Sequence, residues 1–210
     1  FFGESLGPVL ARITERTERI DVREALNYST YASHDLIFNA MGFGFPPDDT
    51  TPLLTNPDYA AGAWVGSATV LARALGLQIR GVEGFREVVT TPRALTVAAG
   101  EIPAGTVGAV RFGVVVDCGE VTLSVEHLTR MADDLAPDWP TEIGYEVTFS
   151  GEPNLRLHLE IGGPHEDHAQ QGCLATAMHA INAISAVLAA EPGVYDLASI
   201  APFGPHWAAC

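Results

Sequence analysis

Two histidines and two carboxylates are crowded into one short segment of the chain. Residues 162–168 read Gly-Gly-Pro-His-Glu-Asp-His, so His165 and His168 stand three residues apart beside Glu166 and Asp167. Imidazole and carboxylate groups are the usual protein ligands of zinc, and a metal-dependent enzyme that uses the His165 and His168 loop is one hypothesis. A turn between a strand and a helix holds the same residue types for local reasons. We favour that interpretation and predict no metal.

His127 is the second candidate for chemistry. The run 121–127 alternates as Val-Thr-Leu-Ser-Val-Glu-His, which places His127 on one face of a predicted strand with two valines and a leucine. Such a histidine is either a hydrogen-bonded core residue or part of a pocket wall, and both interpretations stay open. In a pocket wall, burial would favour a neutral imidazole that hydrogen-bonds a substrate carbonyl or amine.

Charge and composition exclude several classes of function. The formal net charge is −15, and the 11 basic residues are all arginine. A surface of this sign repels nucleic acid and anionic lipid, and it favours a cationic substrate. Without lysine, the chain cannot supply a lysine Schiff base. Three dispersed cysteines and no apolar run of about 18 residues predict a cytoplasmic protein with reduced thiols and no membrane partner.

The sequence has no motif that would hold a dinucleotide. No G-x-G-x-x-G follows a predicted strand, and no Walker loop is present. Gly42 and Gly44 follow a predicted helix and lead into two prolines, so they do not seat a pyrophosphate at a helix N-terminus. We therefore expect weak NAD(P) binding and no turnover from these residues alone.

Periodicity predicts an α+β fold. Helical patterns are followed by a long run of period-two segments and a closing helix. The predicted helices cover residues 4–18, 34–41, 57–76 and 169–190. The predicted strands cover residues 20–28, 79–91, 93–99, 106–117, 120–131, 143–150 and 154–162. We expect one mainly antiparallel sheet, covered by helices on one face. Because segment 106–117 reads as apolar on both sides, we expect the other face to lie in the interface of a homodimer or larger oligomer.

Several stretches resemble the C-terminal domain of the dihydrodipicolinate reductase-like family, which includes 2,4-diaminopentanoate dehydrogenase and the native amine dehydrogenases. They are Ala40-Met41-Gly42-Phe43-Gly44 with its following Pro-Pro, the strand 155–162, and the run from Met178 through Asn182 to Tyr195. The chain lacks the His-His pair and the lysine of dihydrodipicolinate reductase itself, which argues against that substrate.

The resemblance implies a division of labour. Residues 1–210 would be a substrate-binding and dimerisation domain, and an N-terminal Rossmann domain outside this chain would carry NAD or NADP. The implied reaction is hydride transfer between the nicotinamide and an amine or imine carbon of a small-molecule substrate. By position, the resemblance places Phe2, Asn27, Tyr31 and His127 in the substrate pocket and Asn182 near the nicotinamide.

The predicted site follows from these assignments. We expect Phe2, Asn27, Tyr31, His127 and His165 to meet at one end of the sheet as a substrate-binding site. We assign no catalytic residue within these 210 residues, because the family's acid/base carboxylate belongs to the Rossmann half. The alternative is a non-catalytic module that binds a small molecule.

Overall fold

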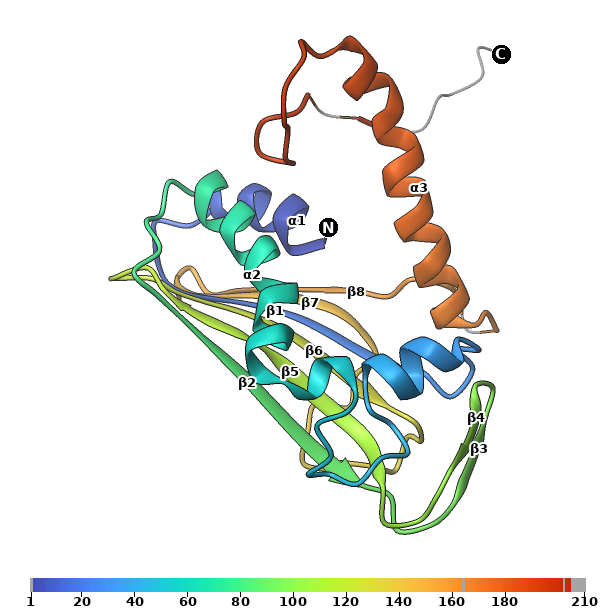
Figure 1. Cartoon of the computed structure of the whole chain (residues 1–210). Coiled ribbons are helices and arrows are strands. Elements are labelled where there is room, and N and C mark those ends of the chain that lie inside the picture. Colours follow the sequence, from blue (N-terminus) through green and yellow to red (C-terminus); the bar gives the residue numbers. More distant parts are fainter. Residues whose placement is uncertain (1, 164, 202, 205–210) are drawn as a thin grey trace.

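The computed structural model describes residues 2–163, 165–201 and 203–204, which adopt an α+β fold (Figure 1). The helices are α1 (Phe2–Ala11), α2 (Pro57–Ala74) and α3 (His168–Ala189), with the short helices η1 (Asp35–Ala40) and η2 (Leu53–Thr55). The strands are β1 (Arg16–Asn27), β2 (Gly81–Thr90), β3 (Leu95–Val97), β4 (Gly100–Ile102), β5 (Val107–Asp117), β6 (Thr122–Arg130), β7 (Gly144–Glu152) and β8 (Leu155–Leu159).

Six strands form one sheet in the order β2-β5-β6-β1-β7-β8. Neighbouring strands among those described run antiparallel, except for the central pair of β1 and β6, which is parallel. The prediction of a mainly antiparallel sheet is therefore confirmed. A tight turn that contains Gly119 joins β5 to β6. The short strands β3 and β4 form a separate hairpin.

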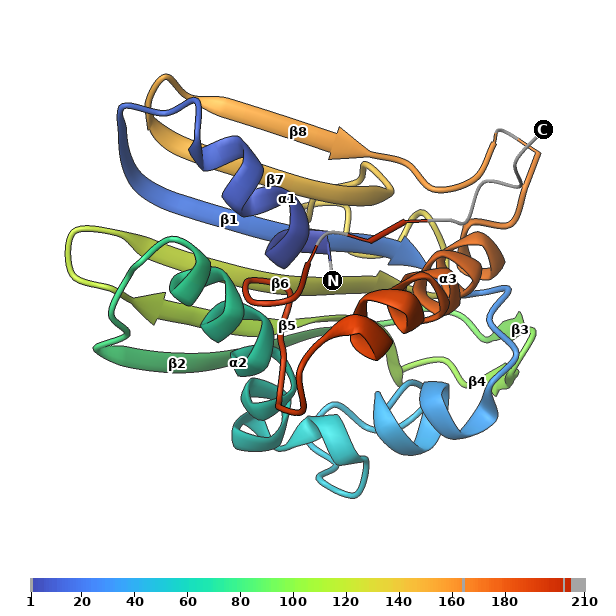
Figure 2. The same ribbon diagram turned by 90° about the horizontal axis from the view of Figure 1, so that it is seen from above.

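Helices α1 and α2 cover one face of the sheet (Figure 2). Alternate residues of the strands point toward them, as Ile20 and Val22 do on β1 and Val114 does on β5. These side chains pack with Ala68 and Leu71 of α2 in a core that excludes water. Period-two apolar patterns form strands here because the pleat places every second residue on the buried face.

Three local predictions are corrected by the structure. The helix predicted over 4–18 ends at Ala11, because the backbone from Arg16 onward pairs with β7 as part of β1. The segment predicted as helix 34–41 forms a π-helix over Asp35–Ala40. The strand predicted over 93–99 shortens to β3, because the chain turns back to form β4.

The opposite face of the sheet carries a row of alternating charges. The row follows the strand order from β2 to β8, and its last member lies in the loop before β7. Its residues are Glu87, Arg111, Glu126, Arg23, Glu146, Arg156 and Glu142. Glu126 accepts from Arg23 at 3.1 Å and from Arg111 at 2.9 Å. Glu146 accepts from Arg23 at 3.2 Å and from Arg156 at 2.5 Å. Hence the two central carboxylates of this row, Glu126 and Glu146, each lie beside two guanidinium groups. We call these seven residues the ion-pair row.

The open face of the sheet is not the apolar surface that segment 106–117 led us to expect. Val110, Phe112, Val114 and Val116 of β5 all lie on the helix-covered face, where they are buried. The opposite face of β5 presents Arg111 instead of a continuous apolar surface. The segment reads as apolar on both sides because glycine and alanine occupy the intervening positions beside Arg111 and Val115.

Helix α3 projects from one end of the sheet and stands apart from α1 and α2 (Figure 1). Five of its large apolar side chains are at least 53% exposed: Leu174, Ile181, Ile184, Val187 and Leu188. By length and mean hydropathy (1.5), α3 is also long and apolar enough to cross a membrane, which the sequence did not lead us to expect. Because α3 is hardly buried in this chain, its apolar face is open to a further surface.

Candidate functional site

Four side chains form a continuous row across the helix-covered face of the sheet. They come from neighbouring strands in register: Phe112 of β5, His127 of β6, Glu24 of β1 and Tyr145 of β7. We call these four residues the site row. Glu24 interrupts an otherwise apolar series on its strand. A carboxylate at such a position costs free energy unless it has hydrogen-bond partners.

His127 is a buried residue with both ring nitrogens in hydrogen bonds. Its Nδ1 lies 3.2 Å from Oε2 of Glu24, and its Nε2 lies 2.5 Å from Oγ1 of Thr129. The rings of Tyr28, Trp64 and Phe112 surround it at centroid distances of 5.8, 5.9 and 5.1 Å. The imidazole is buried, so these contacts fix its orientation.

Glu24, His127 and Thr129 are hydrogen-bonded in the order of a catalytic triad, but the hydroxyl at the end of the series is not accessible. A neutral imidazole completes it, with Nδ1–H donating to Glu24 and Nε2 accepting from the Thr129 hydroxyl. Thr129 is fully buried, so no substrate carbonyl can reach its hydroxyl. The arrangement therefore holds Glu24 in place and does not create a nucleophile.

Glu24 is the member of the site row that offers a charge to solvent. Its side chain is 33% exposed, whereas His127 beside it is 6% exposed. Burial alone would raise the pKa of Glu24. The charge of a protonated His127 and the hydrogen bonds from His127 and Tyr145 lower it below its ordinary value instead. With a neutral imidazole, the Glu24–His127 pair carries one negative charge.

Two cavities meet at Glu24. The first, about 180 Å³, lies beneath α1 and α2, and the second, about 410 Å³, lies between the end of β1 and α3. Glu24, Tyr145 and Thr176 line both of them. The second cavity is within the range of small-molecule sites, which are compact clefts with a few convergent polar groups.

Aromatic rings form much of the cavity walls. Phe2 packs against Tyr145 at a centroid distance of 5.3 Å, and Tyr31 stacks on Tyr28 at 5.2 Å. Trp64 from α2 completes the wall of the first cavity. Burial, followed by the negative charge of Glu24, raises the pKa of both Tyr28 and Tyr145, so both phenols stay protonated as hydrogen-bond donors.

The structure gathers some of the predicted substrate-binding residues and separates others. Phe2 lines the first cavity and Tyr31 lines the second. His127 lies directly behind Glu24, in the core. In the described part of the chain, Asn27 and His165 lie outside both cavities. The direct role of each in substrate binding stays a prediction.

Asn27 and the histidine loop have structural partners. The Asn27 side chain donates to Asp133 at 2.5 Å and accepts from the amide of Ser29 at 2.9 Å. The Nε2 of His168 lies 2.7 Å from the Asn27 carbonyl oxygen and joins α3 to the end of β1. The turn interpretation of the segment therefore accounts for His168, while His165 is exposed.

The N-terminus of α3 does not fit the pyrophosphate of a dinucleotide. Asp167 caps this helix, and its carboxylate accepts from the amides of Ala169 at 2.9 Å and Gln170 at 3.4 Å. The amides that would bind a phosphate are thus occupied, and the carboxylate would repel one. Asn182, predicted to lie near the nicotinamide, is half-buried on the outer half of the same helix.

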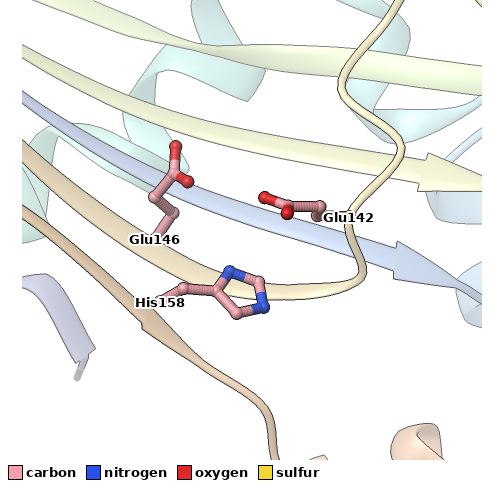
Figure 3. A group of neighbouring side chains, drawn as sticks. All are labelled: Glu142, Glu146 and His158. Atoms are coloured by element: carbon pink, nitrogen blue, oxygen red, sulfur yellow. The ribbon is translucent and has the colours of Figure 1, made fainter.

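Among the described residues, one group has the proximity that a metal site requires. Glu142, Glu146 and His158 have ligand atoms within 4.8 Å of one another (Figure 3). The guanidinium of Arg156 donates to both carboxylates of this group. A cation would have to displace that arginine, so these residues fit the end of the ion-pair row better than a metal centre.

Sequence reasoning missed Glu24, although a signal for it was present. Residues 20–26 alternate as Ile-Asp-Val-Arg-Glu-Ala-Leu, so Glu24 falls on the face of Ile20 and Val22. A carboxylate on the apolar face of a strand is as informative as a histidine there. Tyr145 had no comparable signal, because an aromatic residue is common on a buried strand face.

Comparisons with known proteins agree on one family. A family model described as the 2,4-diaminopentanoate dehydrogenase C-terminal domain matches residues 8–203. An amine dehydrogenase from Streptomyces virginiae is 33% identical over 191 residues, which cover 86% of this chain and 52% of that protein. The solved structure of an amine dehydrogenase from Mycobacterium smegmatis has the same fold, with a TM-score of 0.71, 16% identity, and coverage of 98% of this chain and 58% of that chain.

Proposed function

The chain belongs to the 2,4-diaminopentanoate dehydrogenase C-terminal domain family of oxidoreductases, and from that premise we propose that it forms the substrate-binding part of an NAD(P)-dependent amine dehydrogenase. The proposed reaction is hydride transfer between a nicotinamide and the carbon that bears an amine or imine. The observation that carries the proposal is the pair of aromatic-walled cavities that meet at the carboxylate of Glu24.

The division of labour has two supports. The chain spans about half the length of the curated relative that it matches. The residues of this chain also do not fit a dinucleotide pyrophosphate at the N-terminus of α3, where Asp167 occupies the amides. In the proposal, NAD or NADP is therefore held mainly by a nucleotide-binding domain outside these 210 residues, and it supplies or accepts the hydride when bound.

This chain's own residues bind and orient the amine. Rings from α1, α2 and the end of β1 form walls of the cavities, and Glu24 gives the cavities a negative charge. Hydrogen bonds to His127 and Tyr145 hold that carboxylate before substrate arrives. Such preorganisation lowers the free-energy cost of orienting a polar substrate.

The exposed apolar face of α3 fits a protein neighbour. Its large apolar residues are interrupted by polar side chains such as Gln171, His179 and Asn182, which suits packing against a domain surface better than a bilayer. In the proposal, α3 packs against the nucleotide-binding domain, and the open sheet face pairs two copies in a cytoplasmic homodimer. The ion-pair row would lie in that interface.

The test uses the complete protein that contains this chain. Purified protein is incubated with primary amines and NAD or NADP, and reduced nicotinamide is followed by its absorbance. We expect amine-dependent reduction of one cofactor, whereas residues 1–210 alone give none and bind the cofactor weakly in calorimetry. Failure of the complete protein to turn over any amine in either direction would contradict the proposal. Sedimentation of the complete protein tests the dimer separately.

A further inference from the structure

We propose that Glu24 determines specificity by binding a positively charged group of the substrate that lies away from the reacting carbon. The inference rests on the proposed function, because it assigns a role within the same substrate pocket. It begins from the geometry of Glu24, whose carboxylate lines both cavities and is 33% exposed. A ligand in either cavity can reach its oxygens.

The charge balance around the cavities favours a cation. Glu4 also lines the first cavity, so two carboxylates face the same space. Among the described residues that line either cavity, the one arginine is Arg23, the neighbour of Glu24 in sequence. Its guanidinium lies on the opposite face of the sheet, where it donates to Glu126 and Glu146. A substrate ammonium would be attracted by the carboxylates of both Glu4 and Glu24.

The hydrogen bonds of Glu24 leave room for that ammonium. An ionised carboxylate has about four lone-pair positions, and His127 and Tyr145 use two of them. These contacts lower the pKa of Glu24, although burial alone would raise it, so the carboxylate stays ionised. An ammonium has three N–H donors and can occupy the remaining positions with charge-assisted hydrogen bonds.

The surrounding rings suit the same ligand. Tyr145 and Tyr28 lie on the side of α3, while Trp64 and Phe2 lie on the side of α1 and α2. Aromatic faces attract a cation through the ring quadrupole, and their edges pack against the carbon chain that carries it. A carboxylate enclosed by such rings recognises an alkylammonium and disfavours a second carboxylate.

A role as the acid/base for the reacting amine fits this environment less well. The hydrogen bonds and charge of His127, together with Tyr145, lower the pKa of Glu24, although burial alone would raise it. A carboxylate held ionised in this way is a weak base for an amine proton at neutral pH. Glu24 is thus assigned to binding, with His127 and Tyr145 as positioning residues.

The test compares a diamine with the monoamine of the same carbon skeleton, using the complete enzyme. We expect the wild type to prefer the diamine in kcat/KM by about 10- to 100-fold, the value of one charge-assisted hydrogen bond in a desolvated site. Glu24→Gln should remove that preference by lowering kcat/KM for the diamine far more than kcat/KM for the monoamine, mainly through a higher KM for the diamine. The amide of glutamine has nearly the same size and shape as the carboxylate, so the variant removes the charge alone.

Glu18→Gln is the matched control, because it removes one charge from an exposed residue of the same strand. It should keep the diamine preference. Thermal unfolding of both variants confirms that each is folded. A wild-type enzyme that turns over both amines without preferring the diamine overturns the inference while leaving the proposed function intact. An equal loss of kcat for both amines in Glu24→Gln overturns it in favour of an acid/base role. No turnover of any amine would instead contradict the proposed function.

Discussion

The two faces of the sheet place carboxylates on the same strands but surround them differently. Glu126 and Glu146 lie on the open face, and each accepts from two arginines. Glu24 lies one residue from Arg23 on the covered face, where its donors are a histidine and a tyrosine. On one face the charges are neutralised by permanent cations, and on the other the carboxylate keeps its charge beside a cavity.

The difference separates a structural carboxylate from one that is available to a ligand. A side chain neutralised by arginines on both sides has no remaining charge to offer, and removing it leaves those arginines without partners. Replacing a carboxylate that has a histidine and a tyrosine as donors and lies next to a cavity should cost the fold little stability, because its partners can find other hydrogen bonds. Stability and binding measurements should therefore respond in opposite ways on the two faces.

Among substitutions that keep the size of the side chain, the largest expected effect on stability is at the centre of the ion-pair row. Glu126→Gln should lower the free energy of unfolding by about 2–3 kcal/mol, because Arg23 and Arg111 lose a shared, nearly buried anion. Urea denaturation monitored by circular dichroism measures the change. Glu87→Gln at the exposed end of the row is the control, with an expected loss under about 0.5 kcal/mol. Equal losses for the two variants would show that position in the row is irrelevant.

A smaller loss is expected behind the site row. Thr129→Val should destabilise the protein by about 1–2 kcal/mol, because Nε2 of the buried His127 loses its hydrogen-bond donor. The thermal midpoint reports the loss. Thr176→Val on α3 provides the control, since its hydroxyl donates to the Gly172 carbonyl on an exposed helix. A stability change no larger than that control would mean that His127 does not depend on Thr129.

Replacement of Tyr145 separates its hydroxyl from its ring. Tyr145→Phe keeps the packing against Phe2 and removes the hydrogen bond to Glu24, so the expected loss is about 0.5–1 kcal/mol. Tyr145→Ala removes both and should cost at least about 3 kcal/mol as a truncation in a packed core. Chemical denaturation of the two variants gives both values. If Tyr145→Phe were as destabilised as Tyr145→Ala, the ring would carry no share of the stability.

The fold was predictable to the extent that each strand has one apolar face. The strand β8 and the first half of β6 follow a period of two, and the helices α2 and α3 begin and end within two residues of the predicted positions. The hairpin of β3 and β4 was predicted only in part, because three-residue strands are too short to show a period. The π-helix η1 has an ordinary helical pattern in sequence, so its wider turns come from its surroundings.

The candidate site was less predictable, because it depends on register between strands that are far apart in sequence. Glu24 and His127 are separated by about a hundred residues and become neighbours through the parallel pairing of β1 with β6. No short turn joins β1 to β6, so the sequence does not fix the register of this parallel pair. Periodicity therefore indicates which face each residue occupies but not which residues become neighbours. Sequence reasoning therefore found His127 as a candidate and missed its partner Glu24.

The smallest expected effect, and the sharpest comparison of the two faces, is the pH dependence of Glu24→Gln. The folded protein holds the pKa of Glu24 below its ordinary value of 4.5, so its ionisation stabilises the fold. That contribution is fully present above the unfolded value and is lost as the pH falls through the lower folded pKa. The wild type should exceed Glu24→Gln in stability by less than about 1 kcal/mol at neutral pH, since the side chain is one-third exposed. In denaturant titrations at a series of pH values, this difference should shrink toward zero in acid. A difference that grows as the pH falls would mean that the fold favours the protonated carboxyl, and Glu24 would then lack the fixed charge that distinguishes the covered face.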